Sequence, residues 1–228
     1  MSLRLLLGVL VVIFLSASQG LATPINVLNP SFEAPFCSGT VDWVTCMPNN
    51  WTVYDPAGVY SGTFRPLSNG PGSPWDSIPD GVQVAFSNGG TLTQDLTAVI
   101  IPDMTYTLSV WVSQRWSAGF FLPEIQLLGG VTPVITMNNA NPGGATPTKL
   151  ADGNYTWEDW SMSWTAPTSG PLIGQTLSIV LGSHAPVGFD ATQTDFDNVS
   201  LTTNPEPGMF VLVAGGLIGL GIRRRFVK

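Results

Sequence analysis

The sequence is poor in basic residues, histidine and cysteine. Of 228 residues, eight are Lys or Arg, one is His and two are Cys, and the formal net charge is −7. Most basic residues lie near the ends of the chain, so residues 23–204 contain only Arg65, Arg115 and Lys149 against 14 acidic side chains. Nucleic-acid binding requires clustered cations. This class of function is therefore excluded.

Signatures of the common catalytic sites are also scarce. His184 is the single histidine, and no G-x-S-x-G elbow accompanies the Ser183-His184 pair. No Gly-rich stretch has the form of a phosphate-binding loop. Acidic residues are numerous enough that some pair would meet the roughly 5–10 Å spacing of a glycoside hydrolase by chance. The sequence therefore gives no positive sign of catalysis, and we expect a protein that is not an enzyme.

A 3.6-residue period over ten or more residues is absent from residues 23–204. Short β-branched and aromatic runs alternate instead with clusters of Gly, Pro, Asn and Asp, which is typical of a β-sandwich or barrel. The sequence Asn88-Gly89-Gly90 predicts a hairpin turn between two strands. The expected strands are Ile25–Leu28, Asn50–Tyr54, Val82–Ser87, Thr91–Leu96, Thr105–Ser113, Glu124–Leu128, Val131–Met137, Thr156–Thr165, Gln175–Leu181 and Thr194–Thr202.

Four of the eight tryptophans are candidates for ligand contact. Strand alternation places Trp111 among hydroxyl residues, and Trp157 on the face opposite Trp160 and Trp164. We therefore expect Trp160 and Trp164 in the core. Trp75 lies in a Gly/Pro/Ser-rich loop, where a large aromatic side chain either folds inward or meets a ligand. The predicted ligand-binding residues are Trp111, Trp157, Trp116 and Trp75, and the alternative is that a small sandwich buries them.

The last 24 residues have three ordered features: Pro205-Glu206-Pro207, the uncharged run Met209–Ile222 and the basic cluster Arg223-Arg224-Arg225. As a helix, the run is roughly 21 Å long, which is short for a bilayer core of about 30 Å. The tail closely resembles the PEP-CTERM sorting signal. The resemblance implies recognition by exosortase, an integral-membrane protease-transpeptidase, with transient anchoring in the inner membrane and final delivery to the cell surface or exterior. The alternative is an ordinary C-terminal anchor.

The beginning of the chain agrees with export. Arg4 precedes the apolar run Leu5–Leu15, and small residues follow up to Ala22, which is typical of a signal peptide cleaved after Ala22. We therefore expect a signal peptide at residues 1–22, a single β-sandwich domain at 23–204 and the sorting signal at 205–228. Outside the cytoplasm, Cys37 and Cys46 can form a disulfide, which we favour because two Cys and one His are too few for a zinc site.

Two short motifs flank the expected domain. Asn29-Pro30-Ser31-Phe32-Glu33 opens it, and Asp195-Phe196-Asp197-Asn198-Val199-Ser200-Leu201 closes it. Together with Trp160 and Trp164, they resemble the galactose-binding-like jelly rolls, including the family 4/9-type carbohydrate-binding modules. The resemblance implies adjacent first and last strands and a structural calcium, with Glu33 and Asp197 as carboxylate ligands. The alternative makes Glu33 a surface acid and Asp197 a turn residue bonded to backbone.

These observations lead to an expected function with two alternatives. We expect an exported, non-catalytic surface protein that binds exopolysaccharide or another glycan through one face of a jelly-roll β-sandwich. The first alternative is a structural matrix protein whose partners are proteins. The second is a secreted polysaccharide hydrolase or lyase.

Overall fold

The structure is a computed structural model that describes residues 21–38, 44–55, 61–66, 75, 77–115, 122–183 and 193–205. These residues contain twelve strands and no helix. The strands are β1 Thr23–Ile25, β2 Val44–Cys46, β3 Thr52–Tyr54, β4 Ser61–Arg65, β5 Val84–Ser87, β6 Thr91–Val99, β7 Met104–Ser113, β8 Pro123–Gly129, β9 Thr132–Asn138, β10 Glu158–Thr165, β11 Thr176–Ser183 and β12 Thr194–Pro205.

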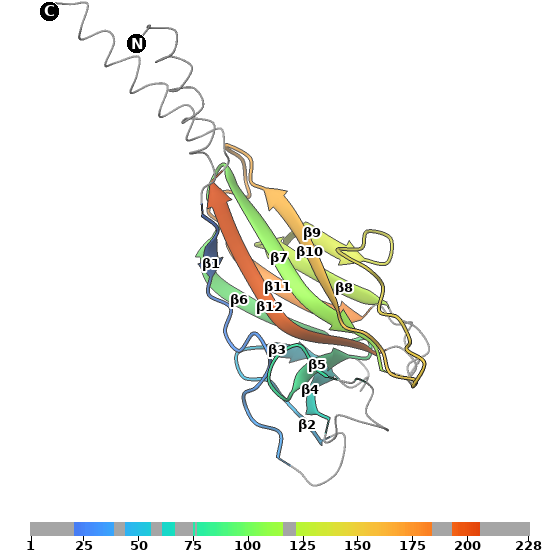
Figure 1. Cartoon of the computed structure of the whole chain (residues 1–228). Helices are drawn as coiled ribbons and strands as arrows, with labels where there is room; N and C mark the ends of the chain where they lie inside the picture. Colours follow the sequence, from blue (N-terminus) through green and yellow to red (C-terminus); the bar gives the residue numbers. More distant parts are fainter. Residues whose placement is uncertain are drawn as a thin grey trace, which may run out of the picture.

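The strands form two antiparallel sheets that lie as two layers (Figure 1). Sheet A has seven strands: six follow the order β10-β7-β12-β5-β4-β2, and β1 pairs with β12. Sheet B has five strands in the order β3-β6-β11-β8-β9. Alternation of apolar and polar residues leaves each sheet one apolar face to bury, and the two sheets bury these faces against each other. The fold is the predicted all-β jelly-roll sandwich.

Each strand predicted from the sequence overlaps an observed strand, but two strands and one turn were not predicted correctly. The unpredicted strands are β2 and β4, which have three and five residues and show no clear alternation. The predicted hairpin at Asn88-Gly89-Gly90 is wrong. Here β5 pairs with β4 and β12 in sheet A, whereas β6 pairs with β3 and β11 in sheet B. The turn therefore carries the chain from one sheet to the other, because its backbone bends as a hairpin does while the flanking strands find other partners.

The main core lies between the sheets. Trp160 of β10 is fully buried there, and Trp164 is half-buried and packs against the same cluster, as predicted. The inward residues of β7 are Tyr106, Leu108, Val110 and Val112, which are all buried. Burying aliphatic and aromatic side chains contributes on the order of 25 cal/mol per Å² of apolar surface. This core is therefore what holds the two sheets together.

The two motifs at the ends of the domain meet in space. β1 pairs with the last part of β12, and the backbone N–H of Val199 donates to the carbonyl of Pro30 at 3.0 Å. β12 is interrupted by a bulge between Asp197 and Ser200, where this contact is made. The first and last strands are thus neighbours, as the jelly-roll resemblance implied.

Several predicted segments lie outside the described residues. They are residues 1–20 of the expected signal peptide, His184, Trp116, and residues 206–228 of the expected sorting signal. Within the part of the chain that the structure describes, no helix is long and apolar enough to span a membrane. Export, exosortase recognition and membrane association therefore stay predictions.

Candidate functional site

Sheet A has an outer face that points away from sheet B, and its two halves differ in chemistry. Over β7 and β10 the outer face carries pairs of hydroxyl groups. Thr105 and Thr165 are hydrogen-bonded at 2.9 Å, and Thr107 and Ser163 at 2.7 Å. These side chains bond one another across neighbouring strands and form a polar surface.

The other half of the outer face, over β4 and β5, is apolar and aromatic. The ring of Phe64 lies 5.5 Å from that of Phe86 and 5.9 Å from that of Trp75. The ring of Trp75 lies 5.0 Å from that of Trp157. Such spacings are typical of favourable aromatic pairs. We call this set the outer aromatic cluster; its members are Phe64, Trp75, Val84 and Phe86, with Ile78, Tyr155 and Trp157 packed against them.

A cavity of about 420 Å³ opens beside the outer aromatic cluster. The aromatic side chains Trp111, Tyr155 and Trp157 line it together with Ile78. Its volume lies in the range of roughly 300–1,000 Å³ that is typical of small-molecule sites. The buried indole nitrogen of Trp157 has no hydrogen-bond partner among the described residues. A side chain that lines the cavity therefore carries a buried N–H donor without a partner among the described residues.

A buried carboxyl group lies on the same face of the sheet. Asp195 of β12 pairs with Phe86 of β5 on one side and with Ser113 of β7 on the other. It is fully buried; Gln193 donates to its Oδ1 at 2.5 Å, and its Oδ2 has no partner among the described residues. Burial raises the pKa of Asp195 to about 8, although the hydrogen bond from Gln193 and the charge of Arg115 lower it in part. At pH 7 this carboxyl group therefore holds a proton.

Ser113 links this acid to the aromatic cluster. The indole nitrogen of Trp75 donates to Ser113 Oγ at 2.7 Å, and Ser113 Oγ donates to the carbonyl of Thr156 at 2.9 Å. Ser113 is the strand neighbour of Asp195, so the Trp75 indole lies next to the acid. The site thus combines flat aromatic surfaces with one protonated acid in a water-poor environment.

Three of the four tryptophans predicted to contact a ligand lie around this site. Trp111 and Trp157 line the cavity, and both are half-buried. Trp75 has folded inward and is 1% exposed. Trp116 lies outside the described residues. Ligand contact by these residues stays a prediction.

Asp195 was not among the functional residues predicted from the sequence. Asp195 and Asp197 alternate with Phe196, which belongs to the main core, so strand geometry places both acids on the outer face. That pattern was visible in the sequence. What was not visible is that the aromatic side chains of β4 and β5 cover this part of the face, because β4 was not predicted as a strand.

Both predicted calcium ligands contact the same turn, at residues 80–83. Glu33 Oε1 accepts hydrogen bonds from the backbone N–H groups of Val82 and Gln83, each at 2.8 Å. Asp197 Oδ2 accepts one from the N–H of Asp80, also at 2.8 Å. The turn approaches Glu33 so closely that a Cβ atom at Gly81 would lie 2.2 Å from Glu33 Oε1. The two acids therefore hold this turn against the first and last strands.

Among the described residues, the groups that shift the pKa of Asp197 at this turn include no basic side chain. Burial raises the pKa of Asp197 to about 8; hydrogen bonds from Asp80 and Asn198 lower it, while the charges of Asp80 and Glu33 raise it. Within the described ranges, no group of three or more His, Cys, Asp or Glu side chains is arranged to hold a metal. Calcium requires six to eight oxygen ligands. These residues by themselves do not form such a shell, and calcium binding here stays a prediction.

Cys37 and Cys46 form a disulfide bond with a Cα–Cα distance of 5.8 Å. Cys46 is the last residue of β2 and pairs with Thr63 of β4, next to Phe64 of the outer aromatic cluster. The disulfide therefore ties the segment after the first motif to the edge of sheet A that carries the aromatic site.

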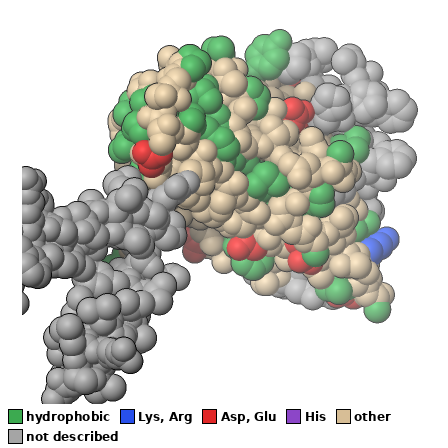
Figure 2. Space-filling view, turned by 90° about the horizontal axis from the view of Figure 1, so that it is seen from above, with side chains coloured by type: hydrophobic (Ala, Val, Ile, Leu, Met, Phe, Trp, Pro, Cys, Tyr) green, Lys and Arg blue, Asp and Glu red, His purple; other side chains and the backbone are tan. Residues whose placement is uncertain are grey.

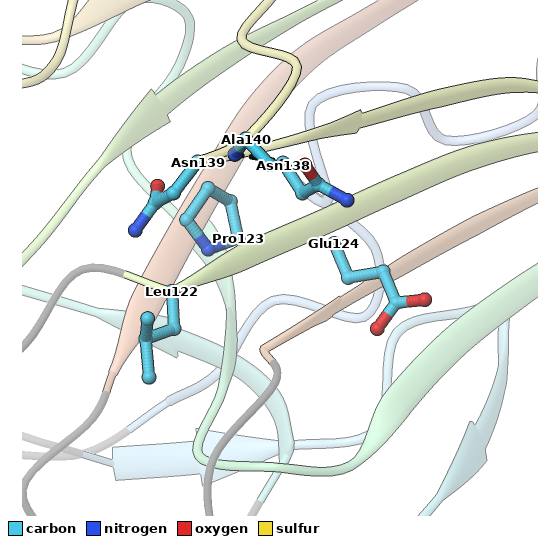
Figure 3. Close-up of a pocket in the computed structure, with 6 residues that line it drawn as sticks. All are labelled: Leu122, Pro123, Glu124, Asn138, Asn139 and Ala140. Atoms are coloured by element: carbon cyan, nitrogen blue, oxygen red, sulfur yellow. Dashed lines mark hydrogen bonds between the residues drawn. The ribbon is translucent and has the colours of Figure 1, made fainter.

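A second hollow, of about 280 Å³, lies where β8 begins and β9 ends. Figure 3 shows that the carboxyl group of Glu124 and the amides of Asn138 and Asn139 do not converge on one point. Glu124 accepts a hydrogen bond from Gln126 at 2.9 Å. None of the described residues that line this hollow is aromatic, and their polar groups do not converge, so they lack the features of the site on sheet A.

Comparison with known proteins identifies a family. The sequence profile of the HpiC1-like family, described as HpiC1 cyclase, matches residues 23–202. No curated protein shows significant sequence similarity to the chain. A ligand-free cyclase from Fischerella sp. is 26% identical with a TM-score of 0.62, over 81% of this chain and 98% of that one.

Two further solved structures hold indole compounds. The Stig cyclase Fisc from Fischerella sp. TAU, in complex with (3Z)-3-(1-methyl-2-pyrrolidinylidene)-3H-indole, is 26% identical with a TM-score of 0.59, over 82% of this chain and 100% of that one. A cyclase from Fischerella sp. TAU in complex with 4-(1H-indol-3-yl)butan-2-one is 27% identical with a TM-score of 0.61, over 81% and 99%. A CBM4 structure is 15% identical with a TM-score of 0.42, which says nothing about function.

These comparisons correct the function expected from the sequence. We expected a non-catalytic surface protein that binds a glycan, because the common catalytic motifs are missing. That expectation is wrong, since the matching family is a cyclase family and the three Fischerella structures described above, with TM-scores of 0.59–0.62, are cyclases. A cyclase can operate with one acid and a shaped aromatic cavity, so the missing motifs do not exclude it. Through the match over residues 23–202, the chain belongs to the HpiC1-like cyclase family.

Proposed function

We propose that this protein is a cyclase that closes a ring within a small aromatic substrate of the indole class. The substrate binds at the cavity beside the outer aromatic cluster, and Asp195 is the proton donor. The observation that carries this assignment is the position of Asp195: a buried carboxyl group, beneath aromatic side chains, whose Oδ2 has no partner among the described residues. Two relatives of about the same size hold indole compounds, which supports the substrate class.

Proton donation by Asp195 would make ring closure easier. Asp195 protonates the unsaturated side chain, and a carbon of the indole ring attacks the resulting cation and forms the new C–C bond. The ring carbon then releases its proton to the Asp195 carboxylate, so that the acid is restored and the product is an isomer of the substrate. Asp195 donates from Oδ2, while Gln193 holds Oδ1 and fixes the orientation of the carboxyl group. A general acid works best when its pKa is near the working pH, and a pKa of about 8 meets this condition.

The remaining residues of the site bind and orient the substrate. The rings of Trp111, Tyr155 and Trp157 offer flat surfaces to an aromatic ligand. The N–H of Trp157, which lacks a partner among the described residues, donates to an acceptor on the substrate. The aromatic walls exclude water, so that the reactive cation formed by protonation is captured within the molecule rather than by solvent.

The substitution Asp195→Asn tests the proposal. The full-length protein is incubated with a panel of indoles that carry an unsaturated side chain, and ring-closed products are identified by chromatography and NMR. Asn resembles the protonated Asp in shape, so the variant should fold normally. Loss of the proton donor should lower kcat by about 10²–10⁴-fold.

Asp95→Asn is the matched control. Asp95 is an acid of sheet B, bonded to Ser178 at 2.7 Å and remote from the cavity, so this variant should retain wild-type activity. Full activity of Asp195→Asn, or an equal loss in both variants, would contradict the role of Asp195. Failure of every indole in the panel to react with the wild-type protein would count against the substrate class.

A further inference from the structure

The cavity and the acid are separated in the structure. Trp111, Tyr155 and Trp157 line the cavity, whereas Asp195 is fully buried and does not line it. A substrate that occupied only the open volume would not reach Oδ2 of Asp195. If the proposed function holds, a side chain must move to join the two.

Trp75 is the side chain that lies between them. Its ring is 5.0 Å from that of Trp157, a wall of the cavity, and its indole nitrogen donates to Ser113, the strand neighbour of Asp195. Phe64 and Phe86, the other rings of the cluster, are held in strands β4 and β5. Trp75 is in no strand, so its displacement does not break a pairing of the sheet.

Ser113 determines what can replace the Trp75 ring. Its hydroxyl donates to the carbonyl of Thr156 at 2.9 Å, which leaves the oxygen as an acceptor toward Trp75. A ligand that replaces the Trp75 ring must therefore donate a hydrogen bond to Ser113 Oγ. An N–H group on the ligand can do this, and a carbonyl group cannot. An indole has the same bicyclic shape and the same N–H donor as the Trp75 side chain.

We propose that Trp75 is a gate, whose indole occupies the position that the substrate's ring takes and is displaced when substrate binds. This inference rests on the proposed function, because it places the substrate at the same site. It adds a selectivity: the site takes a planar bicyclic ring with an N–H donor directed at Ser113. Removing Trp75 opens the cavity to Asp195, whereas removing Trp157 removes a wall.

The test measures binding of indole and 1-methylindole by calorimetry to the full-length wild-type protein and its variants. Trp75→Ala should bind indole at least about tenfold more tightly than wild type, since the competing side chain is gone. The same variant should bind 1-methylindole about tenfold more weakly than indole, because the methyl group removes the donor to Ser113. Trp157→Ala should bind indole more weakly than wild type.

Trp51→Ala is the control, because it also removes a tryptophan side chain and leaves a cavity, but at a place away from Ser113. Trp51 belongs to the main core and donates to the carbonyl of Asn29, so a cavity there has no Ser113 and should not favour indole over its methylated form through that hydroxyl. Should Trp75→Ala fail to fold, Trp75→Phe replaces it and should bind indole with an affinity between those of wild type and the alanine variant.

Weaker indole binding by Trp75→Ala than by wild type would overturn the gate and make Trp75 a wall of the site. Equal binding of the two probes by that variant would overturn the role of Ser113. These outcomes are independent of turnover. Inactivity of the wild-type protein on every indole tested would contradict the proposed reaction while leaving the binding result in place.

Discussion

Asp195 and Asp197 show how neighbouring residues can receive different roles from their contacts. Both lie on the outer face of β12 and both are buried. Asp197 accepts hydrogen bonds from the backbone of Asp80 and Asn198, so each of its oxygens is held by the fold. Asp195 has one side-chain partner, Gln193, and its other oxygen has none among the described residues. Asp197 therefore serves the structure, and Asp195 is the better candidate for chemistry.

Both acids should make the folded protein less stable as the pH rises. Their folded-state pKa of about 8 lies above the usual value of 3.8, so the folded state holds a proton that the unfolded state releases. The free energy of unfolding should therefore fall between about pH 4 and pH 8 and level off above that range, by on the order of a few kcal/mol per group.

Urea unfolding of chelator-treated protein at several pH values measures this dependence. Asp195→Asn and Asp197→Asn should each give a shallower slope than wild type. Stability that rises with pH over this range, or a slope that neither substitution changes, would show that these groups do not titrate as their burial requires. Cyclase activity should fall as the pH passes about 8, because Asp195 then loses the proton it donates.

At the scale of elements, β2, β4 and β5 extend sheet A beyond the main core and provide the outer aromatic cluster. β4 pairs with β5 and with β2, and the cluster residues Phe64 and Phe86 lie on these strands. Trp75, which packs on Phe64, comes from the connection between β4 and β5, whereas Trp157, which packs on Trp75, comes from a distant part of the sequence. The site is thus formed where strands β4 and β5 of sheet A contact Trp75 and Trp157, which lie outside the strands.

The Cys37–Cys46 disulfide should stabilise this edge. The double substitution Cys37→Ser and Cys46→Ser should lower the free energy of unfolding by roughly 2–3 kcal/mol, because the crosslink restricts the unfolded chain. Urea unfolding measures the effect, and reduction of the wild-type protein with dithiothreitol should reproduce it. Unchanged stability in both experiments would mean that the bond does not constrain the chain.

At the scale of the whole molecule, the described domain is acidic and rich in polar surface. Acidic side chains are scattered over the face seen in Figure 2, with basic ones only at its edge. Such a charge distribution keeps a domain soluble but does not attract nucleic acid. It agrees with a domain that binds small, largely neutral aromatic molecules through a cavity rather than charged polymers through a surface.

The C-terminal segment should be dispensable for folding. Deletion of Met209–Lys228 should leave the thermal melting temperature of the domain unchanged, because the last described strand ends at Pro205. The same deletion should reduce membrane and surface retention in cell fractionation, since we propose that this segment is a sorting signal. A deletion variant that does not fold would contradict the first expectation, and unchanged retention would contradict the second.

The sequence by itself determined ten of the twelve described strands, the fold class and the face on which Trp111 and Trp157 lie, because alternation acts over a few neighbouring positions. Only the tertiary structure decided that Asn88–Gly90 crosses between sheets and that Trp75 meets Ser113 and Trp157. Strand pairing depends on which surfaces bury best together in the complete fold, and no local pattern records that. The site could not be predicted for the same reason: its acid and its rings become neighbours only when the chain folds.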